Sequence, residues 1–401
     1  MILKIIYSKN KSYLKKVKVI VIYLDNSATS WPKPENVYKE VERVLKNCGN
    51  PGRGGHRMAL ESGKIIFESR QEICEIFNVK DPMRIVFTSN TTQALNMALK
   101  GVLKYKDHVI TSSMEHNSMI RPLMALKEKG TEITVIKGDE NGEIDVENIK
   151  KEIRENTKLI AITHASNVTG TIMPIKEIGD IARKNNILFL VDAAQTAGVI
   201  PIDVEEFNID LLAFPGHKGL YGPQGTGGLY IREGIDIIPL IEGGTGSESE
   251  SIYQPNLMPD KLESGTLNTP GIAGLKEGIK FIKKIKIESI KKHEKNLIKM
   301  LIEGLEQIKN VKIYGPKNLD NRTGSVSITV DNMDVGDISY ILDKKYNIAA
   351  RAGLHCAPLA HSTIGTLESG TLRFGIGYFN NIDEIKETIR AIEIICKKNN
   401  I

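Results

Sequence analysis

The feature that most restricts the possible folds of this chain is a regular alternation of short apolar runs and helical stretches between residues 84 and 231. The runs consist almost entirely of Val, Ile and Leu, which is typical of strands buried on both faces. Strands are predicted at Ile85–Thr88, His108–Ser112, Glu132–Ile136, Leu159–Thr163, Ile187–Asp192, Leu211–Phe214 and Gly228–Ile231. Helices are predicted between them at Thr92–Leu103, Met119–Glu128, Val146–Glu155 and Ile175–Lys184. The pattern indicates an α/β fold whose mostly parallel sheet is covered by helices on both faces.

The segments on either side of this region extend the prediction to the whole chain. Helices are predicted at residues 34–46, Met58–Phe77 and Asn268–Ile308. The last third is predicted to form a smaller α+β domain from strands Ser325–Val330 and Leu372–Phe374 and helices Val335–Lys344 and Ile382–Lys397. A chain of 401 residues exceeds the size of one ordinary core. We therefore expect an N-terminal arm over residues 1–22, a large domain over residues 23–275 and a small domain over residues 276–401.

The net positive charge of the chain comes from its first residues. The formal net charge is +5, but residues 1–22 carry six lysines and no acidic residue, which leaves a net charge of −1 for the remainder. Nucleic-acid binding is therefore not predicted. The lysines precede Val19–Leu24, which resembles a secretory signal only loosely because it is short and lacks a small-residue cleavage site. We expect a strand at Val19–Leu24 and a loosely held arm over residues 1–18. No apolar run approaches the ~18 residues of a membrane-spanning helix, so no membrane association is expected.

The four cysteines, Cys48, Cys74, Cys356 and Cys396, are widely scattered and include no C-x-x-C pair. This spacing predicts neither a disulfide framework nor a zinc site, so no metal is expected. Cysteines without such pairing are typical of a reducing compartment, and we expect a cytoplasmic protein.

Polar residues follow several predicted strands, at the edge where parallel sheets bind ligands. Thr91 and Thr92 begin a helix whose free N–H groups would favour a phosphate, although an ordinary helix N-cap is an equally good interpretation. His116 follows another strand and either stacks on a planar ligand or forms ordinary loop hydrogen bonds. Asp192 ends an entirely apolar strand, where a carboxylate is costly unless it meets a cation or a strong donor.

A single lysine, Lys218, lies in a loop rich in glycine and aromatic residues that spans Phe214–Gly228. No acidic residue is near it in the sequence. Desolvation disfavours the ammonium form, so we expect a lowered pKa and a nucleophilic amine, as a Schiff-base lysine requires. A surface turn with an ordinary solvated lysine is the alternative.

Eight motifs follow one another along the chain: Asp25-Asn26-Ser27-Ala28-Thr29, Thr91-Thr92-Gln93-Ala94, Glu115-His116-Asn117, Ser166-Asn167-Val168-Thr169-Gly170, Val191-Asp192-Ala193-Ala194-Gln195, Gly216-His217-Lys218, Ser264-Gly265-Thr266-Leu267-Asn268-Thr269 and Arg351-Ala352-Gly353-Leu354-His355-Cys356-Ala357. In this order they resemble the class V aminotransferase branch of pyridoxal phosphate (PLP) enzymes, and within it the cysteine desulfurases and selenocysteine lyases. The resemblance covers roughly residues 23–395. It implies fold type I, with a mostly parallel seven-stranded sheet flanked by helices and a smaller α+β C-terminal domain.

The resemblance implies that PLP is the cofactor and assigns residues to each of its parts. Lys218 would form the Schiff base, Asp192 would pair with the pyridinium nitrogen, and Gln195 would contact the phenolic oxygen. His116 would stack on the ring and act in catalysis. The phosphate would be held by Thr91, Thr92 and His217, together with Thr266 from the second subunit of a homodimer with shared active sites.

The same resemblance implies a substrate site. Arg373 would bind the α-carboxylate of L-cysteine or a related amino acid, with Arg351 and Asn167 beside it. Cys356 would attack the substrate sulfur, so that L-alanine leaves and a persulfide remains for transfer to an acceptor protein or thiol. Arg351, His355 and His361 could each lower the thiol pKa of Cys356. An inert buried cysteine is the alternative interpretation of Cys356, and a metal site formed with the two histidines lacks a recognised zinc spacing.

Other functions remain open at this point. One alternative is a selenocysteine lyase or another class V PLP enzyme of the aminotransferase type, and a second is a PLP-binding partner protein without turnover. A dehydrogenase and a P-loop enzyme are disfavoured because the corresponding glycine-rich motifs are absent. The chain also departs from better-known desulfurases at three positions. Pro215 replaces a phosphate-binding serine, Gly219 is an apparent insertion, and Leu354 replaces the first of two consecutive histidines.

Overall fold

The computed structural model describes residues 21–51 and 54–399. The predicted arm and the first part of the predicted strand Val19–Leu24 lie outside these residues. Within them, strand β1 comprises Ile22–Tyr23.

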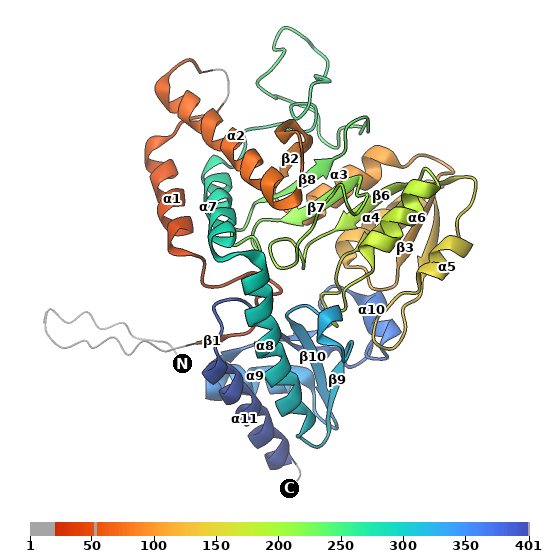
Figure 1. The fold of residues 1–401 in the computed structure, drawn as a ribbon, viewed down its shortest axis with the longest axis vertical. Helices are drawn as coiled ribbons and strands as arrows, with labels where there is room; N and C mark the ends of the chain where they lie inside the picture. The colour runs from red at the N-terminus through yellow and green to blue at the C-terminus, as the bar shows by residue number, and fades with distance from the viewer. Residues whose placement is uncertain (1–20, 52–53, 400–401) are drawn as a thin grey trace, which may run out of the picture.

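A seven-stranded sheet lies at the centre of the larger part of the molecule (Figure 1). Its strands are β2 (Ile85–Thr88), β3 (His108–Ser112), β4 (Glu132–Ile136), β5 (Thr157–Thr163), β6 (Leu188–Asp192), β7 (Leu211–Pro215) and β8 (Gly227–Ile231). They lie in the order β2-β8-β7-β6-β5-β3-β4. The pairs from β7 through β4 are parallel, whereas β8 pairs with β2 and β7 in the antiparallel direction. The predicted mostly parallel seven-stranded sheet is thus confirmed.

Helices cover both faces of this sheet. Those of the larger part are α1 (Glu35–Asn47), α2 (Arg57–Phe77), the short 3₁₀ turn η1 (Pro82–Arg84), α3 (Thr91–Val102), α4 (Asn117–Lys127), α5 (Val146–Lys151), α6 (Ile175–Lys184) and α7 (Thr269–Ile285). Ile160 and Val191 share a core with residues of α2, α6 and α7, while their neighbours Leu159 and Leu190 share another with α3 and α4. Alternate residues of one strand therefore enter different cores, which explains the continuous apolar runs.

A four-stranded antiparallel sheet forms the smaller part of the molecule, in the lower half of Figure 1. The strands lie in the order β12 (Arg351–Gly353), β13 (Thr371–Gly375), β10 (Ser325–Val330) and β9 (Val311–Tyr314). The other elements here are α8 (Ile287–Glu306), η2 (Leu319–Asn321), α9 (Val335–Tyr346), β11 (Ile348–Ala349), α10 (Pro358–Thr363) and α11 (Ile382–Asn399).

The N-terminal strand joins this smaller part. Strand β1 pairs in parallel with β11, and Ile22 and Leu24 lie in the core formed by α8, α9 and α11. The proposed boundary after residue 275 falls within α7, and the division into domains stays a prediction.

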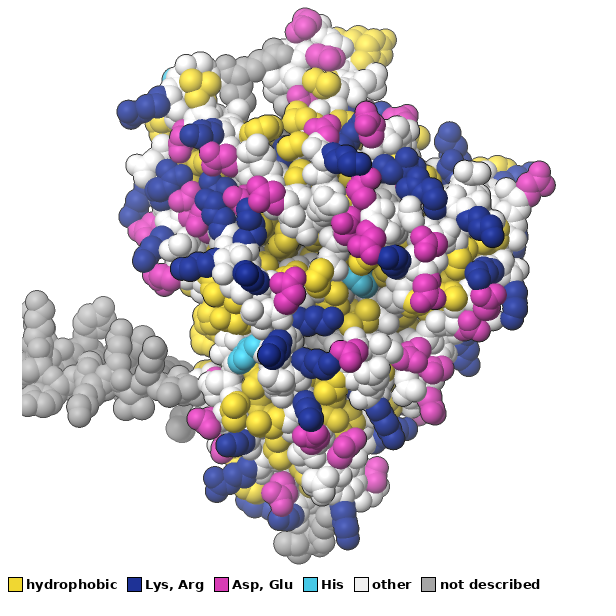
Figure 2. Space-filling model, in the orientation of Figure 1, with side chains coloured by type: hydrophobic (Ala, Val, Ile, Leu, Met, Phe, Trp, Pro, Cys, Tyr) yellow, Lys and Arg dark blue, Asp and Glu magenta, His cyan; other side chains and the backbone are white. Residues whose placement is uncertain are grey.

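Basic and acidic side chains are interspersed over the face of the described residues shown in Figure 2. No helix in the described part of the chain is both long enough and apolar enough to cross a membrane.

Candidate active site

A cavity of about 300 Å³ opens at the carboxyl ends of strands β5, β6 and β7, where it meets residues of the small sheet. It is lined by Ser27, Ala28, Asn90, Thr91, Thr92, His116, Ser118, Thr163, Ala165, Asn167, Asp192, Ala194, Gln195, Pro215, His217, Lys218, Arg351, His355, Cys356 and Arg373. The structure therefore brings together every predicted site residue except Thr266, and it does so at the sheet edge that the strand pattern indicated. A cavity of this volume is at the small end of those that bind ligands.

Lys218 follows strand β7 in a loop that is anchored from the N-terminal segment. The hydroxyl of Ser30 donates to the carbonyl oxygen of Lys218 at 2.8 Å. The surrounding protein desolvates the amine and lowers the pKa of Lys218 to about 8, although the nearby charge of Asp192 opposes the shift. The expected lowered pKa is found, and about a tenth of the amine is neutral at pH 7, far more than for an ordinary lysine.

Asp192 ends strand β6 and is 2% exposed. Burial raises the pKa of its carboxyl to about 6, and the opposing influences are the N–H of Ala194 and the charge of Lys218. The N–H of Ala194 donates to Oδ1 at 2.8 Å. A cationic group inside the cavity would offset the cost of burying this carboxylate, because an opposite charge favours its ionised form.

The N-terminus of helix α3 forms one wall of the cavity. Asn90 caps the helix by accepting from the N–H of Gln93 at 2.9 Å. The buried hydroxyl of Thr91 and the buried Nδ1 atom of His217 have no hydrogen-bond partner among the described residues. Polar atoms left unpaired beside a helix N-terminus fit a phosphate-bearing ligand.

His116 caps helix α4 and is connected to the wall formed by α3. Its Nδ1 atom lies 2.8 Å from the hydroxyl of Ser118, which in turn lies 2.8 Å from the hydroxyl of Thr92. Burial first, and then the charges of Lys218 and Arg373, lower the pKa of His116 to about 4. The ring is therefore neutral at pH 7, which suits stacking on a planar cofactor.

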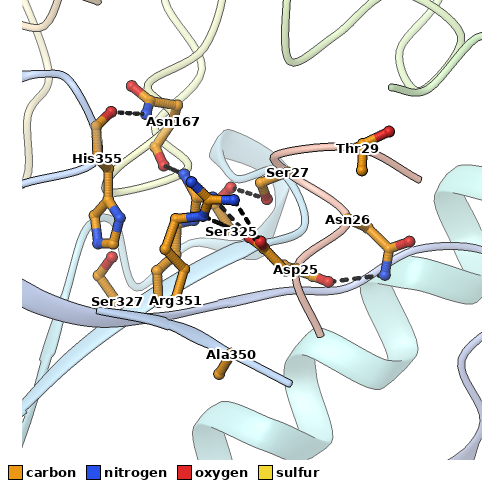
Figure 3. A network of polar contacts seen from close by, with 12 residues as sticks. Asp25, Asn26, Ser27, Thr29, Asn167, Ser325, Ser327, Ala350, Arg351 and His355 are labelled. Atoms are coloured by element: carbon orange, nitrogen blue, oxygen red, sulfur yellow. Dashed lines mark hydrogen bonds and ion pairs between the residues drawn. The ribbon is translucent and has the colours of Figure 1, made fainter. Parts of the chain in front are cut away.

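Arg373 on strand β13 is 3% exposed. Its Nη1 atom donates to the carbonyl oxygen of Asn167 at 2.9 Å, and its Nη2 atom donates to Asp25 at 3.1 Å. The side-chain amide of Asn167 donates to the carbonyl oxygen of His355 at 2.8 Å, as Figure 3 shows. These contacts join the predicted carboxylate-binding arginine to the cysteine loop.

Cys356 is exposed at the tip of this loop. The φ angles of His355 and Cys356 are 47° and 56°, two consecutive left-handed conformations that a residue with a side chain adopts at a cost. Two hydrogen bonds oppose that cost: the one from Asn167 to His355, and one of 2.7 Å from the N–H of Asn117 to the carbonyl oxygen of Cys356. The strained turn presents the thiol to the cavity.

The expectation that histidines activate this thiol by their charge is wrong. Burial lowers the pKa of His355 to about 2 and that of His361 to about 4, so both imidazoles are neutral at pH 7. The positive groups that line the cavity with Cys356 include the guanidinium groups of Arg351 and Arg373. No group of three or more potential metal ligands is found among the described residues.

One of the apparent departures in the sequence, Gly219, has a structural explanation. A Cβ atom at Gly219 would lie 2.5 Å from the carbonyl oxygen of Ala197, so this position requires glycine where the Lys218 loop packs on this backbone. Pro215 ends strand β7 and lines the cavity, where it contributes no hydroxyl.

Sequence reasoning assigned no role to Asp25 or Ser118, although both contact predicted site residues. Asp25 lies in a motif that was recognised, but nothing in the sequence indicates that its side chain meets two arginines. Thr266 does not line the cavity in its own chain; it lines another hollow, beside Gln93 and Asn268, and is exposed.

Comparisons with known proteins agree with this geometry. The sequence profile of the family described as "Aminotransferase class-V" matches residues 22–387. The chain is 36% identical over 386 residues to a "Probable cysteine desulfurase" of Pyrococcus abyssi, with 94% of each protein covered. It is 36% identical over 382 residues to a protein of the same description from Methanothermobacter thermautotrophicus, with 92% of this chain and 94% of the relative covered.

Solved structures show the same similarity. The apo structure of a cysteine desulfurase from Thermococcus onnurineus NA1 has a TM-score of 0.90 and 36% identity, covering 94% of this chain and 95% of that one. The cysteine desulfurase CsdA from Escherichia coli, in an S-sulfonic acid form, has a TM-score of 0.85 and 26% identity, covering 94% of this chain and 95% of that one.

Proposed function

The chain belongs to the class V aminotransferase family, and from this premise we propose that it is a PLP-dependent cysteine desulfurase. It converts L-cysteine to L-alanine and leaves the sulfur as a persulfide on Cys356 for transfer to an acceptor. The observation that carries the proposal is that a lysine with a lowered pKa, an exposed cysteine and a buried arginine line one cavity.

The residues of the cavity fit PLP. The pKa of Asp192 is raised by burial, and the positive pyridinium nitrogen would offset the cost of burying its carboxylate. The unpaired hydroxyl of Thr91 and Nδ1 of His217 would donate to the phosphate. His116 would stack on the ring, and Lys218 would hold the cofactor covalently. When bound, PLP supplies an electron sink that stabilises negative charge at the substrate Cα.

Three further residues are proposed to complete the cofactor site. Thr92 would contribute its hydroxyl to the phosphate, and Gln195 would donate to the phenolic oxygen. The amide of Gln195 now donates to the carbonyl oxygen of Ser27 at 3.1 Å, which places it in the wall of the cavity. Asn167 would lie beside both cofactor and substrate.

The protein's own groups then act on the substrate in a defined order. Arg373 binds the α-carboxylate through a charge-assisted pair, which fixes the amino acid in one orientation. Once it is free of the cofactor, the neutral amine of Lys218 takes the proton from Cα, and its pKa of about 8 suits this exchange near neutral pH. The thiolate of Cys356 attacks the substrate sulfur, so that an S–S bond forms as the Cβ–S bond breaks. Cβ takes a proton in place of sulfur, the ammonium of Lys218 returns a proton to Cα, and L-alanine leaves.

Further parts of the proposal concern partners and location. We propose that an acceptor thiol or protein takes the sulfur from the exposed Cys356, and that the enzyme is a cytoplasmic homodimer. Thr266 supports a shared active site, because it is exposed and lies outside its own cavity. The four cysteines are free, which is compatible with a reducing compartment.

Replacement of the nucleophile tests the proposed function. With PLP, L-cysteine and a reductant present, Cys356→Ala is expected to form alanine at least about 100-fold more slowly than the wild type, because the sulfur has no acceptor on the enzyme. Cys48→Ala is the matched control, because Cys48 is also a free cysteine but lies outside the cavity. Equal rates of alanine formation in Cys356→Ala and the wild type would refute the proposal.

A further inference from the structure

Two arginines stand opposite each other on neighbouring strands at the substrate end of the cavity. Arg351 on β12 is the direct cross-strand partner of Arg373 on β13 in the antiparallel pair. Like charges in such positions destabilise a sheet unless something compensates them. Both arginines line the cavity, so their charge also acts on any ligand there.

Asp25 supplies the compensation. Arg351 donates from Nε to Oδ1 and Oδ2 of Asp25 at 3.2 and 3.0 Å and from Nη2 to Oδ2 at 2.8 Å. Arg373 makes one contact, from Nη2 to Oδ1 at 3.1 Å. Figure 3 shows the side chain of Arg351 extended toward Asp25. The aspartate is thus engaged mainly by Arg351 and leaves most donors of Arg373 free.

The backbone fixes Asp25 in this position from two sides. The N–H of Leu24 donates to the carbonyl oxygen of Ala349 at 2.9 Å, which continues the pairing of β1 with β11. The N–H of Asn26 donates to the carbonyl oxygen of Gly375 at 3.1 Å, at the end of β13. The backbone of Asp25 is therefore held in place and its side chain is only 16% exposed, whereas the side chain of Arg351 is 50% exposed and can move once released.

The three side chains carry two positive charges and one negative charge, which leaves one positive charge for a ligand. We propose that Asp25 is a specificity-determining residue that restricts the site to amino acids with a single carboxylate by holding Arg351. The inference rests on the proposed function, because it takes Arg373 to be the group that binds the substrate carboxylate. Asp25 acts through Arg351 and is thus a positioning residue.

Without the negative charge of Asp25, Arg351 becomes a second available guanidinium beside Arg373. A second carboxylate on the amino acid then gains a charge-assisted pair instead of meeting the repulsion of Asp25. L-aspartate and L-asparagine are a suitable pair of probes, because they have almost the same shape and differ by one negative charge.

The experiment measures the dissociation constants of both probes for the PLP-loaded full-length protein by calorimetry. The preference for L-aspartate is the dissociation constant of L-asparagine divided by that of L-aspartate. In Asp25→Asn the preference for L-aspartate over L-asparagine is expected to rise at least about tenfold relative to the wild type. In Arg351→Gln the preference is expected to fall, because Asp25 then meets Arg373 alone. The double variant removes one charge of each sign and is expected to return to within about threefold of the wild type.

Asp343→Asn makes the same change in net charge on the exposed face of α9 and is expected to leave the preference unchanged. Preferences within about twofold of the wild type in both Asp25→Asn and Arg351→Gln would overturn the inference. If Asp25→Asn does not fold, Arg351→Gln decides alone, because its side chain is half exposed. Alanine formation from L-cysteine by the same wild-type sample tests the proposed function separately, since the binding preference does not depend on turnover.

Discussion

The chemistry of single residues in this cavity is governed by burial more than by neighbouring charge. For Lys218, desolvation lowers the pKa, and the opposing charge of Asp192 only limits the shift. For Asp192, desolvation raises the pKa to about 6 although Lys218 is nearby. The pKa values of the two groups are therefore closer together than those of an ordinary lysine and aspartate, as is typical of functional sites.

The pKa of Lys218 predicts how cofactor loading depends on pH. An ordinary lysine amine becomes neutral only as the pH approaches 10.5, whereas that of Lys218 becomes neutral as the pH rises through about 8. Because the neutral amine attacks the PLP aldehyde, the loading rate of the apoprotein is expected to rise about tenfold per pH unit below 8 and to level off above it. Stopped-flow absorbance between pH 6.5 and 10 measures this rate. A rate that still rises steeply at pH 10 would show an unperturbed lysine.

Some residues of the site could be predicted from the sequence, and others could not. The motifs identified the lining residues such as Lys218 and Asp192, because each follows a strand and the strands end at one edge. They could not show the role of Asp25, because its partner Arg351 lies 326 residues away and meets it through the pairing of β1 with β11 and the contact of Asn26 with the end of β13. Nor could the motif show that His355 is neutral, since its pKa is lowered by burial, which is a property of the fold.

At the scale of elements, the loop after β7 depends on close backbone packing at Gly219. A Cβ atom there would lie 2.5 Å from the carbonyl oxygen of Ala197 and 2.6 Å from Cγ2 of Val199. Gly219→Ala is therefore expected to displace the Lys218 loop and to lower the free energy of unfolding by about 1–3 kcal/mol. Urea denaturation and PLP loading measure the two effects.

Gly244→Ala is the matched control for this prediction, because a Cβ atom at Gly244 would meet nothing within 4 Å. It is expected to unfold at the same urea concentration as the wild type. If Gly219→Ala is equally stable and loads PLP at the normal rate, the loop tolerates a side chain and the packing explanation for Gly219 fails.

Helix α8 carries a buried acid, Glu294, at 4% exposure. Burial raises the pKa of Glu294 to about 8, from an ordinary 4.5, so the folded protein holds its proton over a range where the unfolded chain has released it. A raised carboxyl pKa contributes stability that is fully present below pH 4.5 and is lost as the pH rises through about 8.

Glu294→Gln is expected to remove this loss of stability at high pH, because a neutral amide resembles the protonated acid. The variant should match the wild type near pH 5 and exceed it at pH 9 in free energy of unfolding, by an amount on the order of a few kcal/mol. Denaturation at both pH values gives the difference. A constant offset between the two proteins would mean that Glu294 does not titrate on unfolding.

Element boundaries were predictable where the apolar pattern is regular and less so elsewhere. The strands match within a few residues, because their alternate side chains enter two cores and the runs have sharp polar ends. The helical region Asn268–Ile308 instead divides into α7 and α8 at Lys286, whose φ is 72°. A lysine gives no signal for such a break.

At the scale of the whole molecule, the segment between β8 and α7 exposes several large apolar side chains to solvent. Ile252 and Tyr253 in this segment are 91% and 79% exposed, and Leu257 is 63% exposed. Exposed apolar side chains of this size are typical of interaction surfaces when they gather in one segment. Thr266 lies at the end of the same segment, outside its own cavity. These observations favour the proposed homodimer, in which Thr266 reaches the phosphate of the partner's cofactor.

A complementation experiment distinguishes a shared active site from two independent ones. Lys218→Ala and Thr266→Asp are each expected to be inactive, the second because its carboxylate repels the phosphate. When the two are coexpressed, mixed dimers combine both defects in one site and leave the other intact. With random pairing, about a quarter of the wild-type activity returns. Lys218→Ala coexpressed with Cys356→Ala is the control, because both residues line one cavity of one chain and no intact site can form. Activity in the control alone, or in neither mixture, would contradict a site completed by Thr266 of a second subunit.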